Sequence, residues 1–229
     1  MEPITVIIGG AVLLVSAVTA AAMKCYAAVK DKNKQISSLQ TALASYTQTY
    51  QFEEVDNQLI SNCKDYLQKI FGDDIVGRYA QLSTVDEKEQ FTKVVVNGLA
   101  KEMGVDVKEI KFEDLSPCMR GYAQPRQDSI GIVINRAVLL SDPEQTVKTI
   151  CHELRHCLQF CSLVDNKHGY SDARLAQWLY SWEHYQSCET EADYSGYVAQ
   201  VIELDANLFA NSVFNALNSC LLYTSDAAD

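Results

Sequence analysis

The chain has 229 residues, 48% of them hydrophobic, and a formal net charge of -11 at pH 7. This length fits one compact domain with an appended segment rather than two full domains. The negative charge argues against nucleic acid as a partner, because phosphates are neutralised by Lys and Arg. The eight Cys form no C-x-x-C pair, so free thiols in a reducing compartment are expected rather than a zinc ribbon or a disulfide scaffold.

The segment Ile4–Met23 is uncharged and long enough to cross a bilayer as a helix, at about 1.5 Å per residue. Lysines follow it and Glu2 precedes it, so the positive-inside rule places the rest of the chain in the cytoplasm. The main alternative is a cleaved signal peptide ending near Ala20 or Ala22, which the lack of Lys or Arg before the segment disfavours. The sequence therefore predicts a single-pass transmembrane anchor over residues 1–24.

A helical stalk is expected over residues 25–72. Its first part has a short coiled-coil seam at alternating spacings of three and four: Ile36, Leu39, Leu43, Tyr46 and Tyr50. Because the seam covers only about two heptads, a homodimer through the stalk and a stalk packed on its own domain both remain open. The folded domain is then predicted over 73–219. The last ten residues, Cys220–Asp229, resemble the translation of a sequencing adapter and are expected to be an artefact.

Strand patterns follow the first helix of this domain. A capping box opens that helix at residue 84, and a glycine ends it at residue 104. Weak alternation over 107–112, and two apolar runs over 119–124 and 129–135 around a turn, predict a small antiparallel sheet.

Three helices are predicted after the sheet. Asp142 and Pro143 signal the start of the first, which runs to about Cys161, and Ser171 begins the second. The last is expected over residues 188–217. Helices, a small sheet and three more helices indicate an α+β fold.

The strongest chemical signal is His152-Glu153-Leu154-Arg155-His156 in the first of these three helices. Residues four apart share one helix face, so His152 and His156 can bind one ion together. Two imidazoles and a carboxylate suit Zn²⁺ at a catalytic site, where one position stays open for water. Glu153 can reach that water as general base.

The third ligand must come from another element. Glu189 is assigned as the metal ligand. Asp193, one helical turn further on, is expected to accept a hydrogen bond from the ring nitrogen of a ligand histidine that faces away from the metal. Glu191 is the alternative ligand. It points to another side of that helix from Glu189, so the two cannot both face the zinc. Gln159, one turn past His156, is also expected to contact a ligand histidine. The group that stabilises an oxyanion stays open among Tyr194, Tyr197, His184, His168 and Arg155.

HELRH followed by ETEAD resembles the gluzincin group of zincin metallopeptidases, and residues 107–199 are similar in layout to small bacterial and mobile-element HELRH peptidases. The resemblance implies that Glu189 binds zinc. It also implies that the strand before the HELRH helix holds an extended substrate. Ile130, Ile132 and Ile134 are the candidate substrate strand if that strand lies at the sheet edge, although it could equally be a central core strand.

The expected function is that of a membrane-anchored zinc metalloendopeptidase acting on a protein or peptide. The alternative is a membrane-anchored scaffold or regulatory protein whose zincin-like domain binds a metal or a partner without proteolysis. Glu153 favours the enzyme, because a purely structural metal site does not need an acid beside its first ligand.

Overall fold

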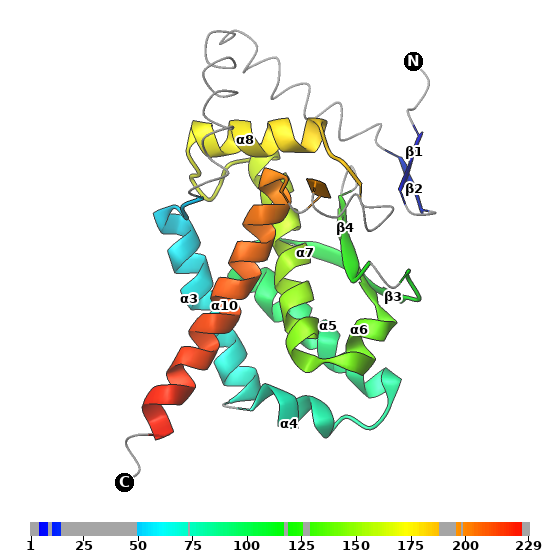
Figure 1. The fold of residues 1–229 in the computed structure, drawn as a ribbon, viewed down its shortest axis with the longest axis vertical. Coiled ribbons are helices and arrows are strands. Elements are labelled where there is room, and N and C mark those ends of the chain that lie inside the picture. The colour runs from blue at the N-terminus through cyan, green and yellow to red at the C-terminus, as the bar shows by residue number, and fades with distance from the viewer. Residues whose placement is uncertain are drawn as a thin grey trace, which may run out of the picture.

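The computed structural model describes residues 5–8, 11–14, 50–72, 74–116, 119–125, 129–187, 196–197 and 199–225. Side chains are described for all of these except 5–8, 11–14, 141 and 218–225. The elements in chain order are β1 (Thr5–Ile8), β2 (Ala11–Leu14), α3 (Glu54–Phe71), α4 (Ile75–Ala80), α5 (Val85–Glu102), β3 (Val107–Glu113), β4 (Gly121–Pro125), β5 (Ile130–Asn135), α6 (Arg136–Ser141), α7 (Pro143–Val164), α8 (Asp172–Glu183) and α10 (Val201–Ser225) (Figure 1). Helices with a small sheet make an α+β fold, as the sequence predicts.

The small sheet is mixed, so the prediction of an antiparallel sheet is wrong in one pairing. Its strand order is β3-β5-β4, with β4 antiparallel and β3 parallel to β5. Only four residues separate β4 from β5 in the sequence, too few for a parallel crossover, whereas β3 joins the opposite edge of β5. Side-chain alternation does not encode strand direction, which explains the error.

The central position of β5 also corrects the predicted substrate strand. All six of its residues are buried, including Ile130, Ile132 and Ile134. These side chains belong to the hydrophobic core and the strand has a partner on both sides, so it cannot receive a peptide by strand addition. Among the described strands, β3 and β4 stand at the two edges of this sheet.

Helix α7 lies in the middle of the domain and packs against β4, β5 and α10 (Figure 1). It begins where the sequence predicts, because the Asp142 side chain accepts a hydrogen bond from the backbone N–H of Glu144 and Pro143 takes the first helical position. The predicted caps of α5 at Thr84 and of α8 at Ser171 are likewise confirmed. The HELRH residues are therefore held on a helix supported on both sides.

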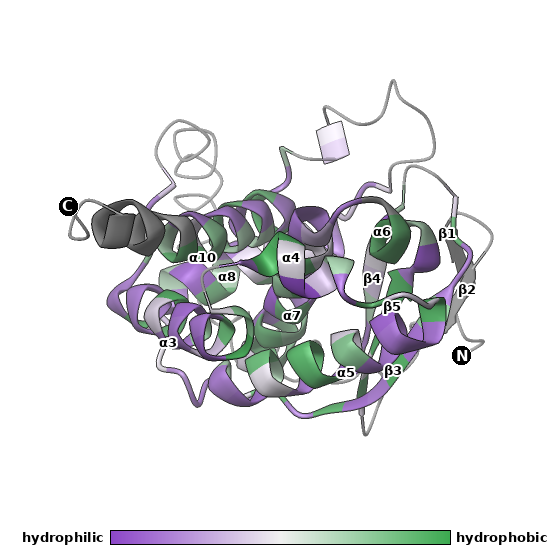
Figure 2. Ribbon diagram, turned by 90° about the horizontal axis from the view of Figure 1, so that it is seen from below, coloured by the Kyte–Doolittle hydropathy of each residue, from purple (hydrophilic) through white to green (hydrophobic). Residues whose placement is uncertain are grey.

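Helix α3 belongs to the folded domain, although the sequence assigned it to the stalk. It packs against α10 and α5, and Figure 2 shows hydrophobic and hydrophilic stretches alternating along it. Leu59, Cys63, Leu67 and Phe71 on its apolar side are buried in the same core cluster as residues of α5, α7 and α10. The folded unit therefore begins before residue 73, and α3 is the helix that packs on its own domain.

This placement predicts a large effect at Leu67, which is completely buried. Leu67→Ala is expected to lower the free energy of unfolding by about 2–5 kcal/mol, because it leaves a cavity in the shared core. Ser61→Ala, an exposed position of the same helix, should change it by less than about 0.5 kcal/mol. Chemical denaturation of the two variants measures both values. Equal, small effects would mean that α3 is a separate stalk.

The N-terminal apolar segment is described only in part, and that part is not helical. Residues 5–8 and 11–14 form the antiparallel pair β1–β2. Val and Ile favour strands, and Gly9-Gly10 between the two runs is a frequent hairpin turn sequence, a signal that hydropathy alone overlooks. In the described part of the chain, no helix combines the length and apolar character needed to cross a bilayer. The seam residues before Tyr50 lie outside the described residues, so the coiled coil stays a prediction.

Candidate metal centre

Three side chains from two helices converge at the centre of the domain. The Nε2 atoms of His152 and His156 on α7 lie 3.0 Å apart. Glu203 on α10 places one carboxylate oxygen 3.3 Å from Nε2 of His152 and the other 3.4 Å from Nε2 of His156. These atoms all lie within 4.8 Å of one another, a spacing that permits a single metal ion. The predicted pairing of the two histidines is therefore observed, and Glu203 is a member that the sequence did not reveal.

Electrostatic attraction between the Glu203 carboxylate and the two histidines holds this cluster together. Burial disfavours the charged imidazolium, but the Glu203 carboxylate outweighs that effect and raises the pKa of His156 to about 9. Burial likewise opposes ionisation of Glu203, yet the two histidines hold its pKa well below the usual value. A carboxylate that is 1% exposed and faces two imidazoles is a strong anionic ligand.

Gln159 contacts the cluster as the sequence predicts. Its side-chain nitrogen donates to the backbone carbonyl of Ile202 at 3.0 Å and to Oδ2 of Asp205 at 2.6 Å. The amide orientation is thereby fixed, and Oε1 faces Nδ1 of His156 at 2.9 Å. Because an amide oxygen only accepts, Nδ1 of His156 carries the proton and Nε2 is directed at the metal position.

Glu153 lies between the two histidines and strand β4. It is 5% exposed and accepts a hydrogen bond from the backbone of Ala123 in β4. Burial raises the pKa of its carboxyl group, opposed by the neighbouring histidines and by that hydrogen bond. A Cβ added at Gly121, also in β4, would lie 3.3 Å from Cγ of Glu153, so the strand passes directly beside the acid.

Aromatic side chains line another side of the cluster. The Trp182 ring meets His156 edge to face, with 5.9 Å between centroids. Tyr185 donates its hydroxyl to Oε1 of Glu203 at 3.1 Å, and Tyr197 hydrogen-bonds to Glu203 and to Tyr185. Burial, followed by the charge of Glu203, raises the pKa of both phenols, so both remain proton donors at neutral pH.

The residues considered for oxyanion stabilisation divide into those that reach the metal cluster and those that do not. Tyr197 reaches the cluster, and Tyr185 reaches it although the sequence did not single it out. Arg155 is fully buried behind the site, where Asp56 and Asp205 bind it. His168 contacts the carbonyl of Met103, and His184 that of Tyr180, so neither is at the cluster. Tyr194 lies outside the described residues.

The predicted third ligand also lies outside the described residues. Glu189, Glu191 and Asp193 all fall there, so their roles stay predictions. The predicted helix over 188–217 is corrected in part, because residues 199–200 are not helical and α10 begins at Val201. Glu203 could have been found as one of only two charged residues between positions 201 and 217, since a buried acid needs a partner.

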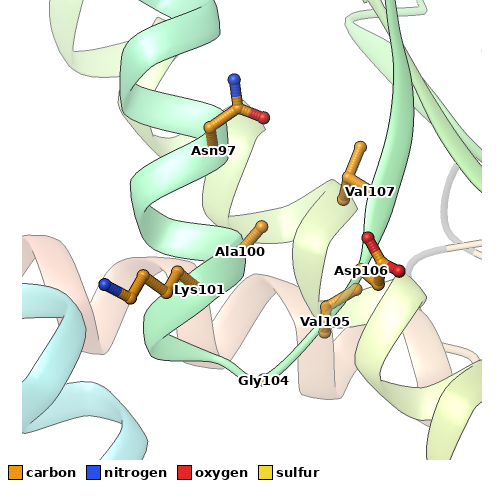
Figure 3. A pocket seen from close by; sticks show the side chains of 7 residues that line it. All are labelled: Asn97, Ala100, Lys101, Gly104, Val105, Asp106 and Val107. Atoms are coloured by element: carbon orange, nitrogen blue, oxygen red, sulfur yellow. The ribbon is translucent and has the colours of Figure 1, made fainter.

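A hollow of about 360 Å³ lies elsewhere, where α5 leads into β3 (Figure 3). Seven residues line it: Asn97, Ala100, Lys101, Gly104, Val105, Asp106 and Val107. None of them belongs to the metal cluster, and Asp106 is paired with Lys108 at 2.5 Å. The hollow offers no convergent set of catalytic or ligating groups.

No protein-family model, curated protein or solved structure matches this chain. The chemistry of the site therefore rests on its own groups: two imidazoles and a carboxylate around one point, an acid beside that point, an edge strand of the described sheet beside the acid, and two phenols that hydrogen-bond to the carboxylate.

Proposed function

We propose that this chain is a zinc-dependent peptidase, with His152, His156 and Glu203 as metal ligands and Glu153 as general base. The observation that carries the proposal is the convergence of all four side chains from α7 and α10. A metal site needs only the first three, so the buried acid beside them is the feature that favours hydrolysis over storage or structural metal binding.

The donor set fits zinc. Ligands about 2.0–2.1 Å from a tetrahedral ion lie about 3.3 Å from one another. The two Nε2 atoms are 3.0 Å apart, and each lies 3.3 or 3.4 Å from a different carboxylate oxygen of Glu203, which is close to that spacing. Among the described residues, Oε2 of Glu203 is buried without a hydrogen-bond partner, so a lone pair is left for a metal. Nitrogen and oxygen donors without thiolate agree with a catalytic zinc, which keeps an open coordination position.

When bound, zinc supplies a Lewis acid that polarises a carbonyl and lowers the pKa of a water molecule. The Glu153 carboxylate would accept a proton from the attacking water, helped by its raised pKa, and would return it to the leaving amine. Tyr185 and Tyr197 hydrogen-bond to Glu203, and either hydroxyl would have to turn from that carboxylate to donate to a developing oxyanion.

Strand β4 is the surface on which an extended peptide is expected to lie. It is an edge strand of the described sheet, and its residues are half-buried. The backbone of Ala123 hydrogen-bonds to the Glu153 carboxyl group. A substrate strand paired with it would bring a peptide bond near the acid. Attachment to a membrane through residues 4–23 stays a prediction from hydropathy.

The test uses the purified full chain. Metal analysis is expected to find about one zinc per chain, and a random peptide library should be cleaved. A chelator should abolish cleavage, and stoichiometric zinc should restore it. A chain that binds no zinc would refute the metal site. A zinc-loaded chain that cleaves neither peptides nor unfolded proteins would instead favour the scaffold.

A further inference from the structure

A buried charged cluster lies directly behind the proposed metal site. Arg155 grips the Asp205 carboxylate with two hydrogen bonds of 2.8 Å, from Nε to Oδ2 and from Nη2 to Oδ1. The same guanidinium binds Asp56 at 2.7 Å and the Tyr170 hydroxyl at 2.7 Å. Arg155, Asp205 and Asp56 are all 0% exposed. A fork-to-fork pair of this kind fixes the direction of a carboxylate as well as its charge.

Asp205 connects this cluster to a metal ligand. Its Oδ2 accepts the hydrogen bond of 2.6 Å from Gln159, and Gln159 in turn accepts the Nδ1–H of His156. The path from Asp205 to the Nε2 atom that faces the metal therefore contains one amide and one imidazole. A shift of Asp205 moves the amide, and the amide sets the ring orientation of His156.

Asp205 also connects the cluster to the lead segment, which we define as residues 50–56. The Tyr50 hydroxyl donates to Oδ1 of Asp205 across 155 residues of sequence. The Arg174 guanidinium lies over the Tyr50 ring at 4.3 Å and donates to the carbonyl of Gln51. Ser171 binds the Glu53 carboxylate, so the lead segment is fastened to the domain at several points.

We propose that Asp205 couples Tyr50 to His156, so that docking of the lead segment tunes the affinity of the site for metal. The proposal rests on the metal site proposed above. Asp205 and Tyr50 are positioning residues, since neither touches the metal ligands' donor atoms.

Two variants and a matched control test the coupling in the full chain, with zinc affinity measured by competition against a chromogenic chelator. Gln159→Leu breaks the path next to His156 and should weaken zinc binding roughly 10- to 100-fold, as loss of a ligand's outer partner does. Tyr50→Phe keeps the ring on Arg174 and removes only the hydroxyl, with an expected loss of about 3- to 10-fold. Tyr170→Phe removes a hydroxyl from the other end of Arg155 and should change affinity less than about 2-fold.

A spectroscopic signature separates positioning from general loosening. In zinc-loaded protein labelled with ¹⁵N-histidine, the buried Nδ1–H of His156 should give a slowly exchanging proton resonance. That exchange should accelerate in Tyr50→Phe and Gln159→Leu and stay slow in Tyr170→Phe. Because the two Tyr→Phe variants each lose one hydroxyl from the same cluster, their melting temperatures control for stability.

Tyr50→Phe that binds zinc as tightly as the unaltered chain overturns the coupling, whatever Gln159→Leu does. Equal losses in Tyr50→Phe and Tyr170→Phe overturn it as well, because loosening of the cluster would then explain both. If the unaltered chain binds no zinc, both the proposed metal site and the coupling are refuted. If it binds zinc, the metal site stands, and the variants test the coupling alone.

Discussion

Glu153→Gln is expected to keep its zinc and lose peptide hydrolysis. Glutamine has nearly the same shape as glutamate, and its side-chain carbonyl can still accept the hydrogen bond from Ala123 in β4. It cannot accept a proton at neutral pH. Removal of a general base lowers turnover by roughly 10²–10⁴-fold. Metal content by mass spectrometry and turnover on a cleaved library peptide measure the two effects on one preparation.

A matched control lies in the same helix. Glu144 is a partly exposed acid in the first turn of α7, where it pairs with Lys148, and Glu144→Gln should leave both zinc content and turnover near those of the unaltered chain. A Glu153→Gln protein that hydrolyses peptides at the full rate would remove Glu153 from the mechanism. A Glu153→Gln protein without zinc would show instead that the acid supports the metal ligands.

The parts of the site that local spacing determines were predictable from the sequence. His152 and His156 share a face of one helix because they are four residues apart, and Glu153 lies beside that face, three residues before His156. The start of that helix is signalled by Asp142 and Pro143. The contact between Gln159 and His156 follows from the same periodicity. Such relations depend on helix geometry and need no knowledge of the remaining fold.

The parts that depend on long-range packing were not predictable in this way. Glu203 meets His156 only because α10 crosses α7, and no spacing rule relates two positions in separate helices. The central position of β5 depends on where β3 enters the sheet, which side-chain alternation does not encode. The sequence of helix α3 shows only an amphipathic helical pattern, which fits a stalk as well as a packed helix. Its contact with α10 is what places its apolar face in the core.

The second large expected effect is a loss of zinc affinity that depends on which glutamate, Glu203 or Glu189, is the third ligand. Glu203→Gln is expected to weaken zinc binding at least about 100-fold, beyond the usual effect of losing an outer partner, because the anion facing both histidines disappears. Glu189→Gln makes the same chemical change at the position that the sequence favours, and it should leave zinc affinity within about 3-fold if Glu203 is the ligand.

Competition titration with a chelator of known affinity measures both proteins side by side. A neutral amide at 203 also removes the charge that raises the pKa of His156, so the metal-free variant should lose the ion pair between α10 and α7 as well. The reverse result, a large loss in Glu189→Gln and none in Glu203→Gln, would assign the third ligand to Glu189. Glu203 would then be a partner of the histidines in the metal-free protein only. Because both changes convert one glutamate into its amide, the difference between them reports which carboxylate the metal needs.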